Sequence, residues 1–179
     1  TLIFRSCNLM IAVLLERDTQ DCVIEALNML YATMGAATFR KLCGVILTDR
    51  GMEFRNVYGI EHSENGKLRT QVFYCDPYCS SQKGSVEKNH EFNRQDLPKK
   101  TSFDWLTQDA VDLMMSHINS YPRARLNDKS PFEVAEFLLG KHLLTRLNLQ
   151  KIPAKDVILR PTLLKVYRIA NLQQEPIHQ

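Results

Sequence analysis

The sequence predicts an α/β fold in which a mixed β-sheet is flanked by helices. Three observations lead to this class. Short apolar runs suited to strands lie in the first half of the chain, helical patterns separate and follow them, and the first two runs are joined too tightly for a helical crossover. The chain has 179 residues, of which 44% are hydrophobic and 24% charged, and that composition supports a real core.

The first two apolar runs cover residues 1–4 and 9–15, with a short break centred on Cys7. They predict a β-hairpin. Every position of the second run is apolar, so we expect its strand to be buried on both faces.

A helix should follow, capped by Asp18 or Thr19 and ended near Gly35. Its apolar positions recur with 4-3-4 spacing and so share one face. They are Val23, Leu27, Leu30 and Met34.

Two further strands are predicted, and each ends at an aspartate. Residues 45–47 form an apolar run that stops at Thr48 and Asp49, which predicts a buried strand ending in a carboxylate. Residues 50–70 are polar, with one helical turn expected near residues 53–58. Residues 72–74 form the next strand, which ends at Asp76.

Helices dominate the second half of the chain. One is expected over residues 85–95 and another over 107–121, the latter with an inward face of Val111, Met114, Met115 and Ile118. The start of a third is marked by Ser130-Pro131-Phe132-Glu133, a capping box with proline at the first helical position, and Gly140 ends or bends that helix. After Lys151 we expect a packed or extended arm to about residue 168 and then a frayed terminus.

Composition narrows the function classes. The five cysteines lack the framework of a disulfide scaffold, and Cys75 with Cys79 has no second pair at zinc-finger spacing. No apolar stretch is long enough to span a membrane. The net charge of +3 and the pI of about 8.6 permit a nucleic-acid partner without requiring one.

Two segments carry residues suited to chemistry. Asp49 closes a strand at the edge where α/β proteins place their sites, and Gly51 allows a sharp turn after it. Glu87 falls in the first turns of the helix expected after Gly84, among side chains that can donate to phosphate oxygens. Taken alone, each segment is better explained by an ordinary structural role, as a strand-ending turn or as a solvated helix start.

Together the segments resemble the catalytic core of DDE transposases and retroviral-type integrases. Within that class the chain is most similar to insertion-sequence transposases of the insertion-sequence-thirty group. Four ordered stretches carry the resemblance, which covers about residues 1–140: residues 47–54 (LTDRGMEF), 74–89 (YCDPYCSSQKGSVEKN), 118–126 (INSYPRARL) and 129–134 (KSPFEV). The resemblance implies that residues 1–140 form an N-terminally incomplete integrase-type core with an RNase H-like sheet flanked by helices. Beyond the resemblance, we expect residues 141–179 to form a C-terminal helix and extended tail.

The resemblance also implies roles for individual residues. Asp49 and Glu87 stand where the second and third acidic residues of the catalytic triad would be, with Glu53 as a possible supporting carboxylate. They would hold Mg²⁺ or Mn²⁺, with two ions expected in the complete site. Candidate DNA-contacting residues are Lys83, Lys88, Asn89, Arg94, Arg123 and Arg125.

The sequence departs from the family pattern at two points. The first triad aspartate belongs on a first strand that the chain lacks, and Asp18 suits helix capping better than a ligand role. Arg50 stands where the family usually has asparagine, and an arginine there could bind phosphate or weaken metal binding.

The implied function is metal-dependent DNA cleavage and strand transfer in transposition and recombination. DNA ends and target DNA would be the partners, a homo-oligomer would act on them, and a bacterial cytoplasm would be the location. Two alternatives stay open: a non-catalytic remnant that binds DNA or pairs with an intact transposase, and a purely hydrolytic nuclease of the same fold.

Overall fold

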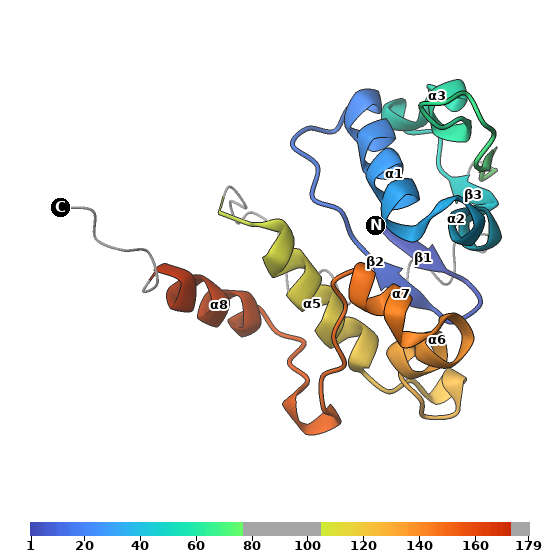
Figure 1. The fold of residues 1–179 in the computed structure, drawn as a ribbon. Coiled ribbons are helices and arrows are strands. Elements are labelled where there is room, and N and C mark those ends of the chain that lie inside the picture. Colours follow the sequence, from blue (N-terminus) through green and yellow to red (C-terminus); the bar gives the residue numbers. More distant parts are fainter. Residues whose placement is uncertain (77–104, 173–179) are drawn as a thin grey trace. The chain divides into compact units, whose positions relative to one another are not determined.

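The computed structural model of the chain describes residues 1–76 and 105–172, with the side chains of 170–172 left aside. These residues divide into two compact units (Figure 1). We call Thr1–Ala12 with Ser85–Gln179 the hairpin unit, and Val13–Gly84 the parallel-strand unit.

The hairpin unit begins with the predicted hairpin. Strands β1 (Leu2–Phe4) and β2 (Leu9–Ile11) pair antiparallel, with Ile3 opposite Met10. All three residues of β2 are buried, as expected. The strand is nevertheless shorter than the apolar run, because it ends at Ile11 and Leu14 is exposed. The apolar run over residues 9–15 therefore predicted the position of the strand correctly and its length incorrectly.

An asparagine from a distant helix satisfies the outer edge of β2. The Met10 amide donates to Asn119 Oδ1 at 2.8 Å, and Asn119 Nδ2 donates to the Met10 carbonyl at 2.6 Å. Asn119 is fully buried. Its side-chain amide thus makes the two hydrogen bonds that a neighbouring strand would make at this position, and the strand edge is not left unpaired in the core.

Three helices follow in this unit: α5 (Gln108–Ser120), α6 (Pro131–Leu139) and α7 (Lys141–Arg146), the last of which contacts α6. Helices α5 and α6 both contact β2 (Figure 1). The predicted inward face of α5 is buried, and Thr107 caps the helix. The predicted capping box of α6 is present with both of its hydrogen bonds. Gly140, with φ +83°, ends α6 and starts α7.

The segment after α7 lies along α5, held by side chains of that helix. Ser116 Oγ accepts from the Gln150 amide, Ser120 Oγ from the Ile152 amide, and His117 Nδ1 from the Ile158 amide, at 3.0, 2.9 and 3.1 Å. The segment then continues through a 3-10 turn, η4 (Ala154–Asp156), into α8 (Thr162–Leu172). A packed arm was expected here, whereas the helix α8 was not.

The parallel-strand unit begins with α1 (Gln20–Met34), which Thr19 caps as predicted. Its four predicted core positions are all buried, and Gly35 follows with φ +81°. A second helix, α2 (Ala36–Cys43), starts directly after Gly35 and was not predicted. Tyr31 of α1 meets Phe39 of α2 edge to face at 5.3 Å, which fixes the corner between the two helices.

Strands β3 (Val45–Thr48) and β4 (Gln71–Tyr74) form a parallel pair. Both were predicted as strands. The expected burial of β3 is wrong, because Val45 is 60% exposed and Leu47 is also exposed, while Thr48 is buried. Apolar composition shows that a strand can be buried, but it does not show which of its faces has a packing partner.

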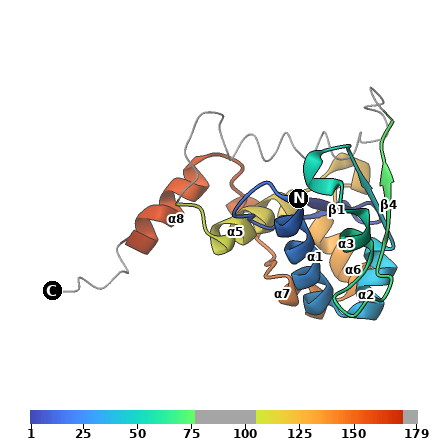
Figure 2. The same ribbon diagram turned by 90° about the horizontal axis from the view of Figure 1, so that it is seen from above.

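Between these strands lie the 3-10 turn η1 (Met52–Phe54) and the short helix α3 (Val57–Glu61), where one helical turn was expected. Helix α3 runs beside β4 and contacts α1 (Figure 2). Arg69 joins α3 to α1 through its side chain, which is only 1% exposed. It donates to the carbonyls of Gly59 and Ile60 at 2.9 Å each and to Asn28 of α1. Burial lowers the pKa of Arg69, and these acceptors offset the cost of burying it.

The described residues are therefore mixed α/β, with an antiparallel pair in one unit and a parallel pair in the other. No single helix in the described part of the chain has the length and apolar composition to cross a membrane, and the bent pair of α1 and α2 passes that test only when taken together. The division predicted at residue 140 stays a prediction.

We predict that Arg69→Met destabilises the chain by about 3 kcal/mol, because two buried carbonyls and an asparagine lose a charged donor. Lys67→Met, at an exposed position of the same loop, is the matched control and should change the unfolding free energy by less than about 0.5 kcal/mol. Urea denaturation measures both. Equal effects of the two substitutions would mean that the Arg69 hydrogen bonds do not hold α3 to α1.

We predict a pH dependence from His117. Burial lowers the pKa of His117 below 6.5, and its Nδ1 must be unprotonated to accept from Ile158. The folded chain thus favours the neutral ring, so this contribution to stability is complete above pH 6.5 and is lost as the pH falls through the folded-state pKa. The loss cannot exceed about 1.4 kcal/mol per pH unit, which corresponds to one proton.

Denaturant unfolding between pH 7.5 and 5 should therefore show a shallower decline for His117→Gln than for the unmodified chain. His142→Gln is the control, since that ring is exposed on α7. A decline that is the same in all three proteins would contradict the assignment.

Candidate active site

The parallel register brings two aspartates to one edge of the β3–β4 pair. Thr48 lies opposite Tyr74, and the Cys75 amide donates to the Thr48 carbonyl at 2.8 Å, which continues the ladder beyond the last paired residues. Asp49 and Asp76 therefore leave the sheet at the same carboxyl edge. The chain that leads on to Glu87 starts at the edge where Asp49 stands.

Asp49 begins a tight turn after β3. Its Oδ1 lies 3.4 Å from the Gly51 amide that donates to it, and both Asp49 and Arg50 are exposed. The carboxylate is thus oriented by the backbone of its own turn and remains accessible to solvent. The prediction that a carboxylate closes this strand at the sheet edge is confirmed.

Glu53 folds back over the same turn. The carboxylate lies against Gly51, where a Cβ atom would stand only 2.4 Å from either Glu53 oxygen. The backbone of Gly51 has φ −56°, a conformation that any residue can adopt. The glycine is therefore needed for space, because a side chain at this position would overlap the Glu53 carboxylate. Asp49 and Glu53 belong to one turn, with the Glu53 side chain directed back toward its start.

Tyr74 holds this turn against the neighbouring strand. Its hydroxyl donates to the Phe54 carbonyl at 2.6 Å and so joins the end of β4 to the end of η1. Sequence reasoning placed Tyr74 in a strand and gave it no role at the site. Its position at the strand end, beside the predicted aspartate, was the signal that could have indicated one.

Several predicted site residues lie outside the described part of the chain. They are Lys83, Glu87, Lys88, Asn89 and Arg94. Within the described residues, no three histidine, cysteine, aspartate or glutamate side chains converge as a metal site. Described carboxylates alone therefore do not form a complete metal centre.

The predicted pair Arg123 and Arg125 belongs to the hairpin unit. Both residues lie at η3 (Ala124–Leu126), in a loop closed by backbone pairing of Arg123 with Lys129. Burial lowers the pKa of Arg123 to about 10, and repulsion by Arg125 adds to the shift. Arg123 remains cationic at neutral pH, and an anion placed between the two side chains would offset their repulsion.

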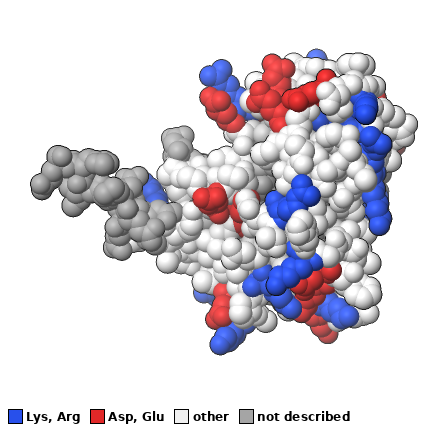
Figure 3. All heavy atoms as spheres, viewed as in Figure 1, with Lys and Arg blue, Asp and Glu red and all other residues white. Residues whose placement is uncertain are grey.

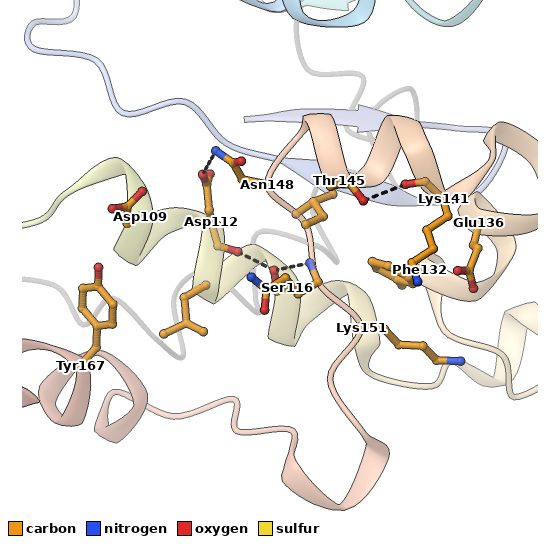
Figure 4. Close-up of a pocket in the computed structure, with 13 residues that line it drawn as sticks. Asp109, Asp112, Ser116, Phe132, Glu136, Lys141, Thr145, Asn148, Lys151 and Tyr167 are labelled. Carbon is orange, nitrogen blue, oxygen red and sulfur yellow. Dashed lines mark hydrogen bonds between the residues drawn. The ribbon is translucent and has the colours of Figure 1, made fainter.

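A cavity of about 720 Å³ lies elsewhere in the hairpin unit, among α5, α6, α7 and the segment along α5 (Figure 4). Its most acidic part holds Asp109 and Asp112. The Asp112 carboxylate accepts from Gln108 at 2.7 Å and from Asn148 at 3.1 Å, so both of its oxygens already have donors (Figure 4 shows the second contact). This carboxylate joins α5 to the end of α7 and is not a candidate metal ligand.

Charge is mixed over the surface. Basic and acidic side chains adjoin one another on the face that Figure 3 shows. Lys151 and Glu133, for example, form an ion pair at 3.1 Å. In the cationic pair at η3, Arg123 is half-buried and Arg125 is exposed, and the two side chains repel each other.

Comparison with known proteins places the relatives of this chain among the transposases of insertion sequences. Transposase InsI of element IS30A from Escherichia coli K12 is 36% identical over 88 residues, which are 49% of this chain and 22% of that transposase. The transposase of IS1086 from Cupriavidus metallidurans is 36% identical over 70 residues, 39% of this chain and 21% of the relative. The transposase of IS4351 from Bacteroides fragilis is 30% identical over 104 residues, 58% and 30% of the two chains.

The resemblance to insertion-sequence transposases that the motifs indicated is thereby confirmed. The matched stretches make up less than a third of each of these relatives. No protein-family profile matches the chain, and no solved structure matches it.

The contact between Gly51 and Glu53 generates a testable prediction. Gly51→Ala should destabilise the chain by up to about 1 kcal/mol, because the new methyl group displaces the Glu53 carboxylate. In a chain that already carries Glu53→Ala, the same substitution should be neutral or stabilise by up to about 1 kcal/mol, since alanine restricts the unfolded chain. Urea denaturation of the four proteins measures this coupling. Additive effects would show that the carboxylate does not lie over Gly51.

Proposed function

We propose that the chain contributes the catalytic core of a DNA transposase, in which Asp49 and Glu87 hold divalent cations for DNA cleavage and strand transfer. One observation carries the proposal. The parallel β3–β4 register starts the Glu87 segment at the sheet edge that bears Asp49. The transposase relatives supply the independent support.

The proposed fold is an RNase H-like sheet. Its supporting components are an antiparallel hairpin, β1–β2, and a parallel pair, β3–β4, whose loops carry the acidic residues. The hairpin's outer strand β2 has its edge satisfied by Asn119. That arrangement suits an edge strand, so further strands of the sheet would add on the side of β1.

The donor set fits a hard cation. Aspartate and glutamate oxygens are the ligands that Mg²⁺ and Mn²⁺ prefer, and Asp49 is exposed where such an ion could reach it. Glu53 adds a carboxylate on the same turn. Bound there, such ions would supply Lewis-acid activation of the attacking oxygen and charge stabilisation of the leaving oxygen of the phosphodiester.

The protein side chains then have distinct tasks. Asp49 and Glu87 would hold the cations, and the Gly51 amide orients the Asp49 carboxylate. Water attacks the phosphodiester first and releases a 3′-hydroxyl. That hydroxyl then attacks a phosphodiester of target DNA and displaces its 3′-oxygen, without a covalent protein–DNA intermediate. Arg50 is next to Asp49 and exposed, and its proposed role is to contact a phosphate oxygen.

DNA is the proposed partner, bound through its phosphates. The cationic pair Arg123 and Arg125 supports this, since a phosphate would relieve their repulsion. Proposed contacts from the segment around Glu87 are those of Lys83, Lys88, Asn89 and Arg94. We further propose a homo-oligomer on DNA, because two element ends must be brought together, and a bacterial cytoplasmic location.

The proposal predicts Mn²⁺- or Mg²⁺-dependent nicking of supercoiled plasmid and joining of labelled oligonucleotides to it. Asp49→Asn and Glu87→Gln should each reduce both activities at least about 100-fold, because a lost carboxylate removes metal charge stabilisation of several kcal/mol. Glu25→Gln, at an exposed position of α1, is the matched control and should act as the unmodified chain does.

Nicking that survives Asp49→Asn, or that persists in EDTA, would contradict the metal assignment. Nicking without joined products would instead identify a hydrolytic nuclease.

A further inference from the structure

An exposed aromatic platform stands on α3, in the unit that carries Asp49. Tyr58 is 69% exposed, and its ring stacks on His62 with centroids 4.2 Å apart and planes 18° from parallel. The His62 ring is held in turn, because its Nδ1–H donates to the Tyr58 carbonyl at 3.1 Å. The tyrosine is thus supported on one face of its ring.

The other sides of α3 are already used for packing. Gly59 lies against Ile24 of α1, where a Cβ would stand 2.5 Å from the isoleucine Cδ1, and Ile60 is buried. Glu61 accepts from the Val72 amide of β4 at 2.9 Å. Tyr58 and His62 instead contact each other, and the Tyr58 side chain is exposed. The platform is therefore a feature of the surface, separate from the contacts that hold the helix in place.

The surroundings of the platform are partly apolar and carry charges of both signs. Arg55, before α3, and Lys67, in the loop after it, are exposed. Leu68 pairs across an isolated bridge with His62 and is exposed as well. The nearby carboxylate of Glu64 accepts from Asn28 at 3.1 Å. Glu61 and Glu64 each accept a hydrogen bond from a donor of the protein, the Val72 amide and the Asn28 side chain respectively.

We propose that the Tyr58–His62 pair is a stacking site for an unpaired base of single-stranded DNA, with Arg55 and Lys67 contacting the flanking phosphates. A flat aromatic ring with cations beside it matches both parts of a nucleotide, and base–aromatic stacking contributes about 1–3 kcal/mol per base. A paired base inside a duplex hides its faces in the stack, so the site selects unpaired DNA. This inference rests on the proposed function only in taking DNA as the partner.

Fluorescence anisotropy tests the site with the full chain and a short labelled oligothymidylate, in EDTA so that no metal takes part. Tyr58→Ala should weaken binding about tenfold, whereas Tyr58→Trp keeps a stacking surface and should bind at least as tightly as the unmodified chain. Phe137→Ala is the matched control, because Phe137 is 89% exposed and lies in the other unit. Binding to a blunt duplex should be unaffected by all three substitutions.

A second measurement identifies the residue directly. An oligonucleotide carrying 5-iodouracil should, on irradiation, crosslink to the peptide that contains Tyr58, as mass spectrometry would show. The inference is overturned if the unmodified chain does not bind oligothymidylate, if Tyr58→Ala binds it as tightly, or if Phe137→Ala weakens binding equally. It is also overturned if Tyr58→Ala changes only self-association in gel filtration, since the surface would then be a protein contact.

The outcomes separate this inference from the proposed catalysis. Loss of binding in Tyr58→Ala together with metal-independent nicking would support the base-stacking site and reject the metal site. Normal binding in Tyr58→Ala together with nicking that depends on Asp49 would reject the base-stacking site and support the metal site.

Discussion

The position of the candidate active site depends on the parallel register of β3 and β4. Parallel strands end at the same edge of a sheet, so the pairing of Thr48 with Tyr74 decides where both following loops begin. A shift by one residue would turn Asp49 toward the opposite face of the strand. The hydrogen bond from Cys75 to Thr48 and the one from Tyr74 to Phe54 both reinforce this register.

Single polar side chains complete the backbone hydrogen bonding in each unit. Asn119 makes the two bonds that a strand would make with Met10, and Arg69 satisfies two carbonyls of α3. Both side chains are almost fully buried, and Asn119 reaches a strand that is 109 positions away in the sequence. The strands have only three and four residues, so strand pairing alone satisfies few backbone groups. Without these two side chains, buried backbone amides and carbonyls nearby would lack hydrogen-bond partners.

The sequence predicted what local patterns determine. The 4-3-4 face of α1 and the capping box of α6 are local, and both were confirmed. Helix α2 was missed because Gly35 ends α1 and starts α2 without a side-chain cap. The exposure of Val45 and the role of Arg69 depend on which distant elements pack nearby, and periodicity carries no information about that. At the site, motif order predicted roles for Asp49 and Glu53, whereas the hydrogen bond from Tyr74 to the same turn could be found only in the structure.

The central claim is that Asp49 and Glu87 bind the same divalent ion. Iron-directed cleavage of the polypeptide tests this claim most directly. Fe²⁺ bound in place of Mg²⁺ reduces added hydrogen peroxide to hydroxyl radicals, with ascorbate returning Fe³⁺ to Fe²⁺, and these radicals cut the chain close to the ion. The account predicts two groups of cuts, one near Asp49 and one near Glu87, both suppressed by excess Mg²⁺ and both lost in Asp49→Asn. Cuts near one residue alone, or cuts near Glu87 that survive Asp49→Asn, would contradict it.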